Sequence, residues 1–260
     1  MNLLAFDTAT EFLSIALEFN GQIFTYDGDG GAKASEAILP QIQTLLNTAK
    51  IQLNQLDGIA FGAGPGAFTG VRVACGVAQG LGFGGNIPVV GINTLHALAE
   101  ASGADKVIVC QDARMGEIYF SALQKQGDGW LEIVPTCLVK PDCLPTIIGD
   151  DWVAVGSGWA AFKGDLETHF ANNLTVLPFE VENLTVLPLE FQNLTVLPSE
   201  FQNLTVLKCQ KPQTTAEALL KLAKPIFASG LAQKASEARP LYVRNRVALT
   251  AQQREAGERL

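Results

Sequence analysis

Short apolar runs and amphipathic segments alternate along the first half of the chain. Apolar runs of about four to eight residues are typical of strands, whereas apolar residues that recur every three or four positions are typical of helices. The Asn20-Gly21 pair between two apolar runs indicates a tight hairpin. Pro40 falls inside the first helical segment and is expected to bend it. The pattern predicts strands at 3–6, 12–19, 22–26, 56–61 and 88–92, and helices from residue 35, after residue 69 and from residue 94.

The same order of elements starts again at Lys106, and Asp7 and Asp112 end corresponding strands. Two copies of one βββαβαβα plan predict a duplicated α/β fold of the actin-like ATPase (ASKHA, ribonuclease H-like) type with a cleft between its halves. We expect domains at 1–103 and 104–260, the second containing the C-terminal helix and tail. The second half is predicted to have strands at 106–110, 117–123, near 131–134, at 152–155 and at 174–177, a short helix near 141–148 and a helix from residue 159.

A tandem repeat interrupts the second half at residues 173–207. The sequence Asn-Leu-Thr-Val-Leu starts at residues 173, 183, 193 and 203, a strict period of ten. One copy is expected to supply the last strand, and the others form either an extended loop or stacked short hairpins. The Asn-Leu-Thr triplets match the glycosylation pattern, but no secretory signal precedes them. The insert could also be a self-association module.

Two further features follow the insert. The segment 214–217 has the form of a capping box and predicts a helix that runs toward Gly230, with a kink at Pro225. The tail, residues 239–246, gathers three arginines in an otherwise acidic chain. It is either a docking patch or a solvated tail.

Composition narrows the classes of function. The 260 residues are 48% hydrophobic, enough for a sizeable core, and the net charge of -8 argues against independent nucleic-acid binding. A role on RNA would therefore need a basic partner. The sequence shows neither a secretory leader nor an apolar run of membrane-spanning length. Five cysteines without a CxxC pair favour a reducing compartment, so we expect a cytoplasmic protein without membrane contact.

A glycine-rich loop at residues 61–72 joins a predicted strand to a predicted helix, and Thr69 is expected to be the N-cap of that helix. Such a loop can offer backbone donors to a phosphate, although it lacks both the Walker ending and the dinucleotide spacing. Its glycines could instead serve a tight turn and close helix packing. Asp7 could hold a Mg²⁺-nucleotide beside the loop, or it could only accept backbone N–H groups of its own turn. The candidate vestigial nucleotide-binding residues are Asp7, Thr8, Gly64 and Gly66.

Other catalytic chemistry is not indicated. The two histidines, His96 and His169, have no partner at metal-binding spacing, and no serine lies in a nucleophile elbow. We therefore predict no catalytic residue, no metal site and no cofactor. The alternative is a small actin-like kinase or ATPase that uses Asp7 and the glycine-rich loop.

Four motifs together resemble the TsaB (YeaZ) family: Asp7-Thr8-Ala9-Thr10 and the segments 64–72, 112–119 and 240–245. Proteins of this family are companions of TsaD, the subunit that transfers threonylcarbamoyl to adenosine 37 of tRNAs that read ANN codons. The resemblance implies a non-catalytic scaffold that pairs with TsaD, while TsaE supplies an ATP-driven step. It also implies contact with tRNA only through the complex, and leaves a homodimer open.

The resemblance also bears on metal binding. TsaD holds a metal with two histidines four residues apart, and the corresponding positions here, aligned on Gly91-Ile92, are Thr94 and Leu98. A hydroxyl and an alkyl group cannot replace imidazoles on a transition metal. The chain also departs from the family pattern at Ala34, where a histidine commonly precedes Ser-Glu, and in its repeat insert.

Pairing in the family uses the two helices that correspond to 36–46 and 69–81. Apolar stripes on these helices are expected to form a helix-on-helix interface. About half of the residues must instead face the sheet of their own domain, because each helix also needs a core face. The predicted partner-binding residues are Ile38, Leu39, Ile42, Leu45, Val71, Ala74, Val77 and Ala78.

Overall fold

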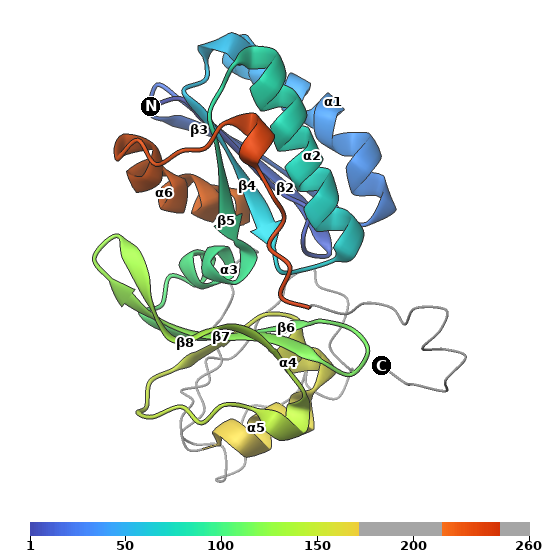
Figure 1. Cartoon of the computed structure of the whole chain (residues 1–260), viewed down its shortest axis with the longest axis vertical. Helices are drawn as coiled ribbons and strands as arrows, with labels where there is room; N and C mark the ends of the chain where they lie inside the picture. Colours follow the sequence, from blue (N-terminus) through green and yellow to red (C-terminus); the bar gives the residue numbers. More distant parts are fainter. Residues whose placement is uncertain (172–214, 245–260) are drawn as a thin grey trace, which may run out of the picture.

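The described residues form two β-sheets, one from each half of the chain, and the halves are stacked one above the other (Figure 1). It is a computed structural model that describes residues 1–171 and 215–244. The first sheet has the order β3-β2-β1-β4-β5, with β2 antiparallel to its neighbours and β4 and β5 parallel to β1. Its strands are β1 Leu3–Asp7, β2 Phe12–Phe19, β3 Gln22–Asp29, β4 Gly58–Gly64 and β5 Val89–Asn93.

The predicted hairpin between β2 and β3 is confirmed. Asn20 and Gly21 have φ angles of 51° and 79°, and they join strands in which Phe19 pairs with Gln22. A two-residue turn of this hand needs positive φ at both positions, which Asn and Gly tolerate best. The strand predicted at 12–19 has the same bounds as β2, whereas β3 and β4 each continue three residues beyond their predicted ends.

Helices cover both faces of the first sheet. Helices α1 (Ala32–Ala49) and α2 (Phe68–Gly85) lie on one face, where Leu4 and Phe6 belong to the same buried cluster as residues of both helices. Leu3 and Ala5 point to the other face, as alternation along a strand requires. A short 3-10 turn, η1 (Leu53–Gln55), links α1 to β4.

The second face of this sheet is covered by helix α6, Thr215–Ala228, which returns to the first half after the insert (Figure 1). Its buried residues share a cluster with Leu3, Ala5 and Ala16, and the Ala216 N–H donates to Ser14 Oγ at 3.2 Å. The expected assignment of this helix to the second domain is therefore wrong. Without α6, the apolar side of β1 and β2 would lie open to water.

The second sheet has the order β8-β7-β6-β9 and repeats the topology of the first as far as its fourth strand. Its core includes Phe120, Trp152 and Phe170. The predicted strand at 174–177 and the repeats lie outside the described residues. The strands are β6 Lys106–Asp112, β7 Ile118–Gln126, β8 Gly129–Val139 and β9 Val153–Val155.

Two helices predicted for the second half differ from those found. The short helix expected near 141–148 is only a 3-10 turn, η2 (Pro141–Cys143). The helix expected from residue 159 is split at Phe162 into α4 (Gly158–Ala161) and α5 (Lys163–Phe170). Phe162 has φ -126° and ψ 37°, which is not helical and ends the first segment.

The halves meet through α3 (Thr94–Ser102), which leaves β5 and lies over the second sheet. Leu95 and Ala99 of this helix pack with Val107 and Leu123. Polar contacts flank this apolar contact: Asn93 Nδ2 donates to Thr136 Oγ1 at 2.7 Å, His96 Nε2 lies 2.8 Å from Glu132 Oε1, and Trp130 Nε1 donates to Glu100 at 3.0 Å. The halves therefore share a packed interface.

No helix in the described part of the chain is both long and apolar enough to cross a membrane.

Candidate functional site

Asp7 ends β1, where its carboxylate is enclosed by the protein. The residue is fully buried, and its Oδ1 accepts the Ala9 N–H at 2.7 Å, as in an Asx turn. A Cβ on Gly62 would overlap this carboxylate, so the neighbouring strand lies directly against it. Burial raises the pKa of Asp7 from 3.8 to about 6 and outweighs the hydrogen bond from Ala9, which lowers it. The geometry favours a turn-forming role for Asp7 over a ligand-binding one.

The glycine-rich loop packs against the turn between β1 and β2. Thr8 is buried and its hydroxyl donates to the Gly70 carbonyl at 2.7 Å, while the Ala67 N–H donates to the Ala9 carbonyl at 2.8 Å. A Cβ on Gly66 would overlap the Ala9 carbonyl oxygen, and one on Gly70 would overlap that of Thr8. These glycines therefore permit close backbone packing, and part of the donor set that a phosphate would need is already used.

The expected N-cap of the second helix is wrong. Helix α2 starts at Phe68 with Ala67 as its N-cap, and no side chain caps it. Thr69 lies one residue inside the helix and is exposed. The Val71 N–H donates to the Ala67 carbonyl at 3.0 Å. The first helical hydrogen bond therefore begins at Ala67, and Thr69 lies inside the first turn instead of at the N-cap position.

The chain tail also reaches this loop. The Leu241 N–H donates to the Ala63 carbonyl at 2.7 Å. Gly64 has a φ of 105°, and a Cβ at this position would lie 3.0 Å from the Leu241 carbonyl oxygen. Of the four candidate nucleotide residues, Asp7 and Thr8 are thus buried in their own turn, and Gly64 and Gly66 contact protein backbone.

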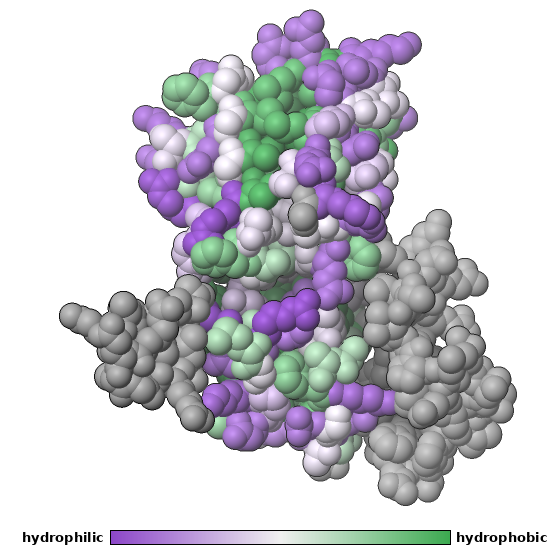
Figure 2. All heavy atoms as spheres, turned by 90° about the vertical axis from the view of Figure 1, so that its right-hand side faces the viewer, coloured by the Kyte–Doolittle hydropathy of each residue, from purple (hydrophilic) through white to green (hydrophobic). Residues whose placement is uncertain are grey.

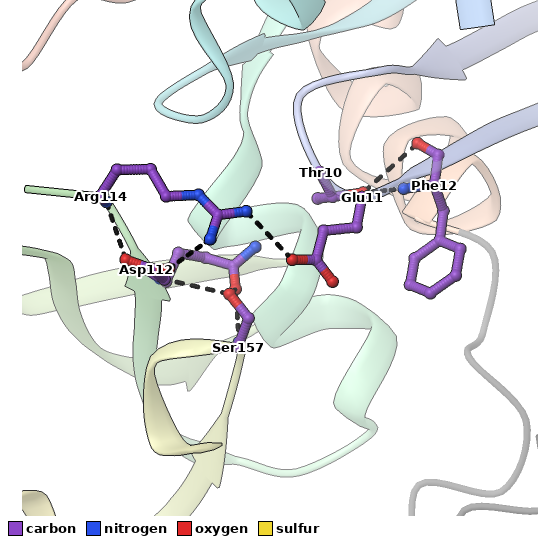
Figure 3. Close-up of polar contacts among 7 residues, drawn as sticks. Thr10, Glu11, Phe12, Asp112, Arg114 and Ser157 are labelled. Atoms are coloured by element: carbon purple, nitrogen blue, oxygen red, sulfur yellow. Dashed lines mark hydrogen bonds and ion pairs between the residues drawn. The ribbon is translucent and has the colours of Figure 1, made fainter. Parts of the chain in front are cut away.

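The turn after β6 faces the turn after β1, and side chains of the two turns are in contact (Figure 3). Asp112 accepts from Arg114 N at 2.8 Å and from Arg114 Nη1 at 2.9 Å, and the Asp112 N–H donates to Ser157 Oγ at 3.2 Å. Arg114 Nη2 lies 3.5 Å from Glu11 Oε1 of the first half. Sequence reasoning did not find the Arg114–Glu11 contact, because nothing in the local pattern pairs two turns so far apart.

Most of the predicted partner-binding residues belong to the core of their own domain, so their prediction as surface contacts is corrected. The apolar spacing that suggested an interface is the core face of each helix. Leu39 is 51% exposed and Val77 is partly buried, so these two remain on the surface. The buried ones are Ile38, Ile42, Leu45, Val71, Ala74 and Ala78.

A different face of α2 is exposed and carries glycines at every fourth position. A Cβ on Gly76, Gly80 or Gly84 would meet no atom within 4 Å. Phe83, beside them, is 82% exposed. Figure 2 shows a band of apolar residues along the upper half of the molecule, on the side where α1 and α2 lie in Figure 1. We call this surface the glycine face; it consists of Val73, Gly76, Val77, Gly80, Leu81, Phe83 and Gly84.

Similar proteins are known. The tRNA threonylcarbamoyladenosine biosynthesis protein TsaB of Escherichia coli is 32% identical over 256 residues, which cover 95% of this chain and 96% of that protein. The protein of the same name from Haemophilus influenzae is 37% identical over 191 residues, 68% of this chain and 81% of the relative. The solved structure of YeaZ from Pseudomonas aeruginosa superposes with a TM-score of 0.72 at 31% identity, covering 93% of this chain and 99% of that one.

The two related sheets, the facing turns and this structural likeness define an α/β protein with the actin-like, ribonuclease H-like ATPase fold. A family model described as TsaD, tRNA N6-adenosine threonylcarbamoyltransferase, matches residues 31–175. By its similarity to the proteins from Escherichia coli and Haemophilus influenzae, the chain belongs to the TsaB (YeaZ) family.

Proposed function

We propose that this chain is a non-catalytic scaffold in the formation of threonylcarbamoyladenosine at position 37 of tRNA, and that it pairs with a TsaD subunit. The observation that carries the proposal is that the groups of a would-be nucleotide site are buried or bonded within the chain. Asp7 is fully buried, and the amide of Ala67 in the glycine-rich loop is bonded to the chain's own turn. An actin-like ATPase needs these same groups to face a nucleotide.

The glycine face supplies the docking surface of the proposed pair. Glycines at positions 76, 80 and 84 let the backbone of a partner helix approach closely, since no Cβ atoms stand between them. Phe83 offers an exposed aromatic anchor of the kind that dominates binding energy in interfaces. Leu39 on α1 widens the apolar surface beside it.

The charge of the chain favours an indirect role on RNA. With a net charge of -8 it would be repelled by tRNA phosphates, so the basic groups that hold the tRNA belong to a partner. In the proposed complex, which would work in the cytoplasm, TsaD carries out the transfer and TsaE supplies an ATP-dependent step.

Peptidase chemistry receives no support from the two histidines. A second solved chain, from Pseudomonas aeruginosa, is described as similar to a peptidase, with 32% identity to this chain. Here His96 contacts Glu132, and His169 Nε2 lies 3.2 Å from the Pro145 carbonyl oxygen. Neither histidine activates a serine or cysteine among these contacts.

The proposed pairing is tested by Gly80→Glu, measured by calorimetric titration with TsaD from the same cell. A charge placed in a desolvated helix contact without a partner costs several kcal/mol, so we expect pairing to be lost. Folding should be kept, because glutamate is a better helix former than glycine. Gly164→Glu is the matched control, since Gly164 is also a helical glycine with open space around it, but in the second half.

Wild-type affinity of Gly80→Glu for TsaD would refute the docking surface. A self-association that Gly80→Glu removes, with TsaD binding unchanged, would show that the same face pairs two copies of this chain. The scaffold role itself is tested by deleting the gene and measuring threonylcarbamoyladenosine in digested tRNA. Expression of the Asp7→Asn variant in the deletion strain is expected to restore the modification.

A further inference from the structure

The segment that follows α6 runs beside α2 from the first half toward the second (Figure 1). We call residues 240–244 the strap. After α6 the chain forms the 3-10 turn η5 (Ala235–Glu237), where Gln79 Nε2 of α2 donates to the Ala238 carbonyl at 3.0 Å. The Leu241 N–H then donates to the Ala63 carbonyl of β4 at 2.7 Å. These two bonds anchor the strap to the first half.

The other end of the strap is anchored to the second half. The Arg244 side chain is only 11% exposed, and its Nη2 donates to Glu117 Oε2 and to the Arg114 carbonyl. Its Nη1 lies 3.4 Å from Met115 Sδ. Hydrogen bonds between charged groups are among the stronger ones in proteins, and burial limits their screening by solvent. Arg244 is therefore a firm anchor on the turn between β6 and β7.

Side chains between the two anchors are packed as well. Val243 packs against the apolar cluster that contains Leu95 and Tyr119, at the junction of the halves. The Arg72 guanidinium carbon lies 3.2 Å from the centroid of the Phe68 ring and 5.0 Å from that of Tyr242. Arg72 thus links the strap to the first turn of α2 through cation–π contacts.

The strap is too short to permit the halves to separate. Only Tyr242 and Val243 lie between Leu241 and Arg244, and an extended chain spans at most about 3.3–3.6 Å per residue. The Cα atoms of Leu241 and Arg244 can therefore lie at most roughly 10–11 Å apart, and the Arg244 side chain adds only its own fixed length to this reach. A larger opening must break either the bond from Leu241 or the contacts of Arg244.

We propose that the strap holds the two halves at one fixed angle, in the place where a bound nucleotide would bridge them in an ATPase of this fold. Two domains of one chain are expected to move relative to each other unless their interface or another contact restrains them. The strap is that restraint, and the Arg114–Glu11 contact on the opposite turns assists it. The chain is then a rigid body, and neither closure nor opening of its cleft forms part of its working cycle.

The proposal is tested on the isolated chain by releasing each anchor separately. Arg244→Ala removes the anchor on the second half, and Leu241→Pro removes the N–H that bonds to Ala63. Arg239→Ala is the matched control, because among the described residues the Arg239 guanidinium donates to the carbonyls of Ser236 and Ala238, both within the same segment. If Arg244→Ala fails to fold by circular dichroism, the isosteric Glu117→Gln replaces it.

Two measurements are made on each variant. Amide exchange at Leu241 should become about tenfold to a hundredfold faster in Arg244→Ala, which corresponds to the loss of a charged hydrogen bond. Distances between probes on exposed Gln43 in α1 and exposed Thr168 in α5 should form one narrow distribution in the wild type, unchanged by Mg²⁺-ATP. Both anchor variants should broaden it, and Arg239→Ala should not.

A narrow distribution that survives in both anchor variants while Leu241 exchanges quickly would overturn the proposal, as would a broad distribution in the wild type. Neither result depends on TsaD, so a failure here is distinct from a failure of the proposed pairing.

Discussion

Replacing Asp7 with asparagine should make the chain more stable at neutral pH and remove part of its pH dependence. Asp7 is fully buried, and burial raises its pKa from 3.8 to about 6. The ionised form is therefore disfavoured in the folded state. At about 1.36 kcal/mol per pKa unit, the carboxylate costs about 3 kcal/mol of folding free energy above pH 7.

The sign follows from proton linkage. Between pH 3.8 and about 6 the folded chain binds more protons at Asp7 than the unfolded chain, so its stability rises as pH falls through that window. Between pH 7 and pH 5 the contribution of Asp7 amounts to about 1 kcal/mol. Asparagine keeps the oxygen that accepts the Ala9 N–H but cannot titrate, so the variant should lack this contribution.

The assay is urea unfolding of both proteins from pH 5 to pH 8 at constant ionic strength. We expect the stability of Asp7→Asn relative to wild type to grow by about 1 kcal/mol between pH 5 and pH 7, while exposed Asp128→Asn tracks the wild type. Asp27, whose pKa burial also raises, is present in both proteins and cancels. A constant difference between the Asp7→Asn and wild-type curves would refute the claim that burial governs this carboxylate.

Three further predictions follow from the glycines and the insert. Gly70→Ala should destabilise the chain by about 1–3 kcal/mol in urea unfolding, because its Cβ would overlap the Thr8 carbonyl oxygen. Gly76→Ala and Gly80→Ala, where a Cβ has open space, should each stabilise the isolated chain by about 0.5–1 kcal/mol yet weaken binding to TsaD in calorimetric titration. Reducing the four repeats to one should preserve folding and TsaD binding, since a long loop costs little extra closure entropy. Insoluble or unpaired protein after that deletion would show that the insert is structural.

Local patterns in the sequence predicted most elements of the first half, but not the split at Phe162 in the second half or the packing of α6. The Asn20-Gly21 turn needs only two residues of the right type, and β2 has the predicted bounds. The position of α6 was wrong because an amphipathic pattern shows that a helix has a core face without showing which sheet it covers. The sheet it covers depends on Leu3 and Ala16, which lie far from α6 in the chain.

The candidate site shows the same limit. The position of Asp7 at the end of a strand suggested either a turn-forming residue or a ligand-binding residue. Its full burial and its close contact with Gly62 favour the turn-forming role, and neither feature can be read from the sequence. The apolar residues of α1 and α2 suggested an interface, although six of the eight face the core. Residues 76, 80 and 84 gave a better signal for the surface, because these glycines pack against no side chain or loop in the described part of the chain.

The glycine face therefore carries an energetic argument for a partner. Each glycine inside a helix is less favourable than alanine by about 0.8–1.0 kcal/mol, so Gly76, Gly80 and Gly84 together cost roughly 2–3 kcal/mol. Gly70, also inside α2, offsets a similar cost by close packing against the turn after β1, but the three exposed glycines have no such contact with the described residues. A partner helix that approaches through their missing Cβ atoms would offset it, and the isolated chain cannot. The stability lost on this face is thus consistent with a surface adapted to binding rather than to folding.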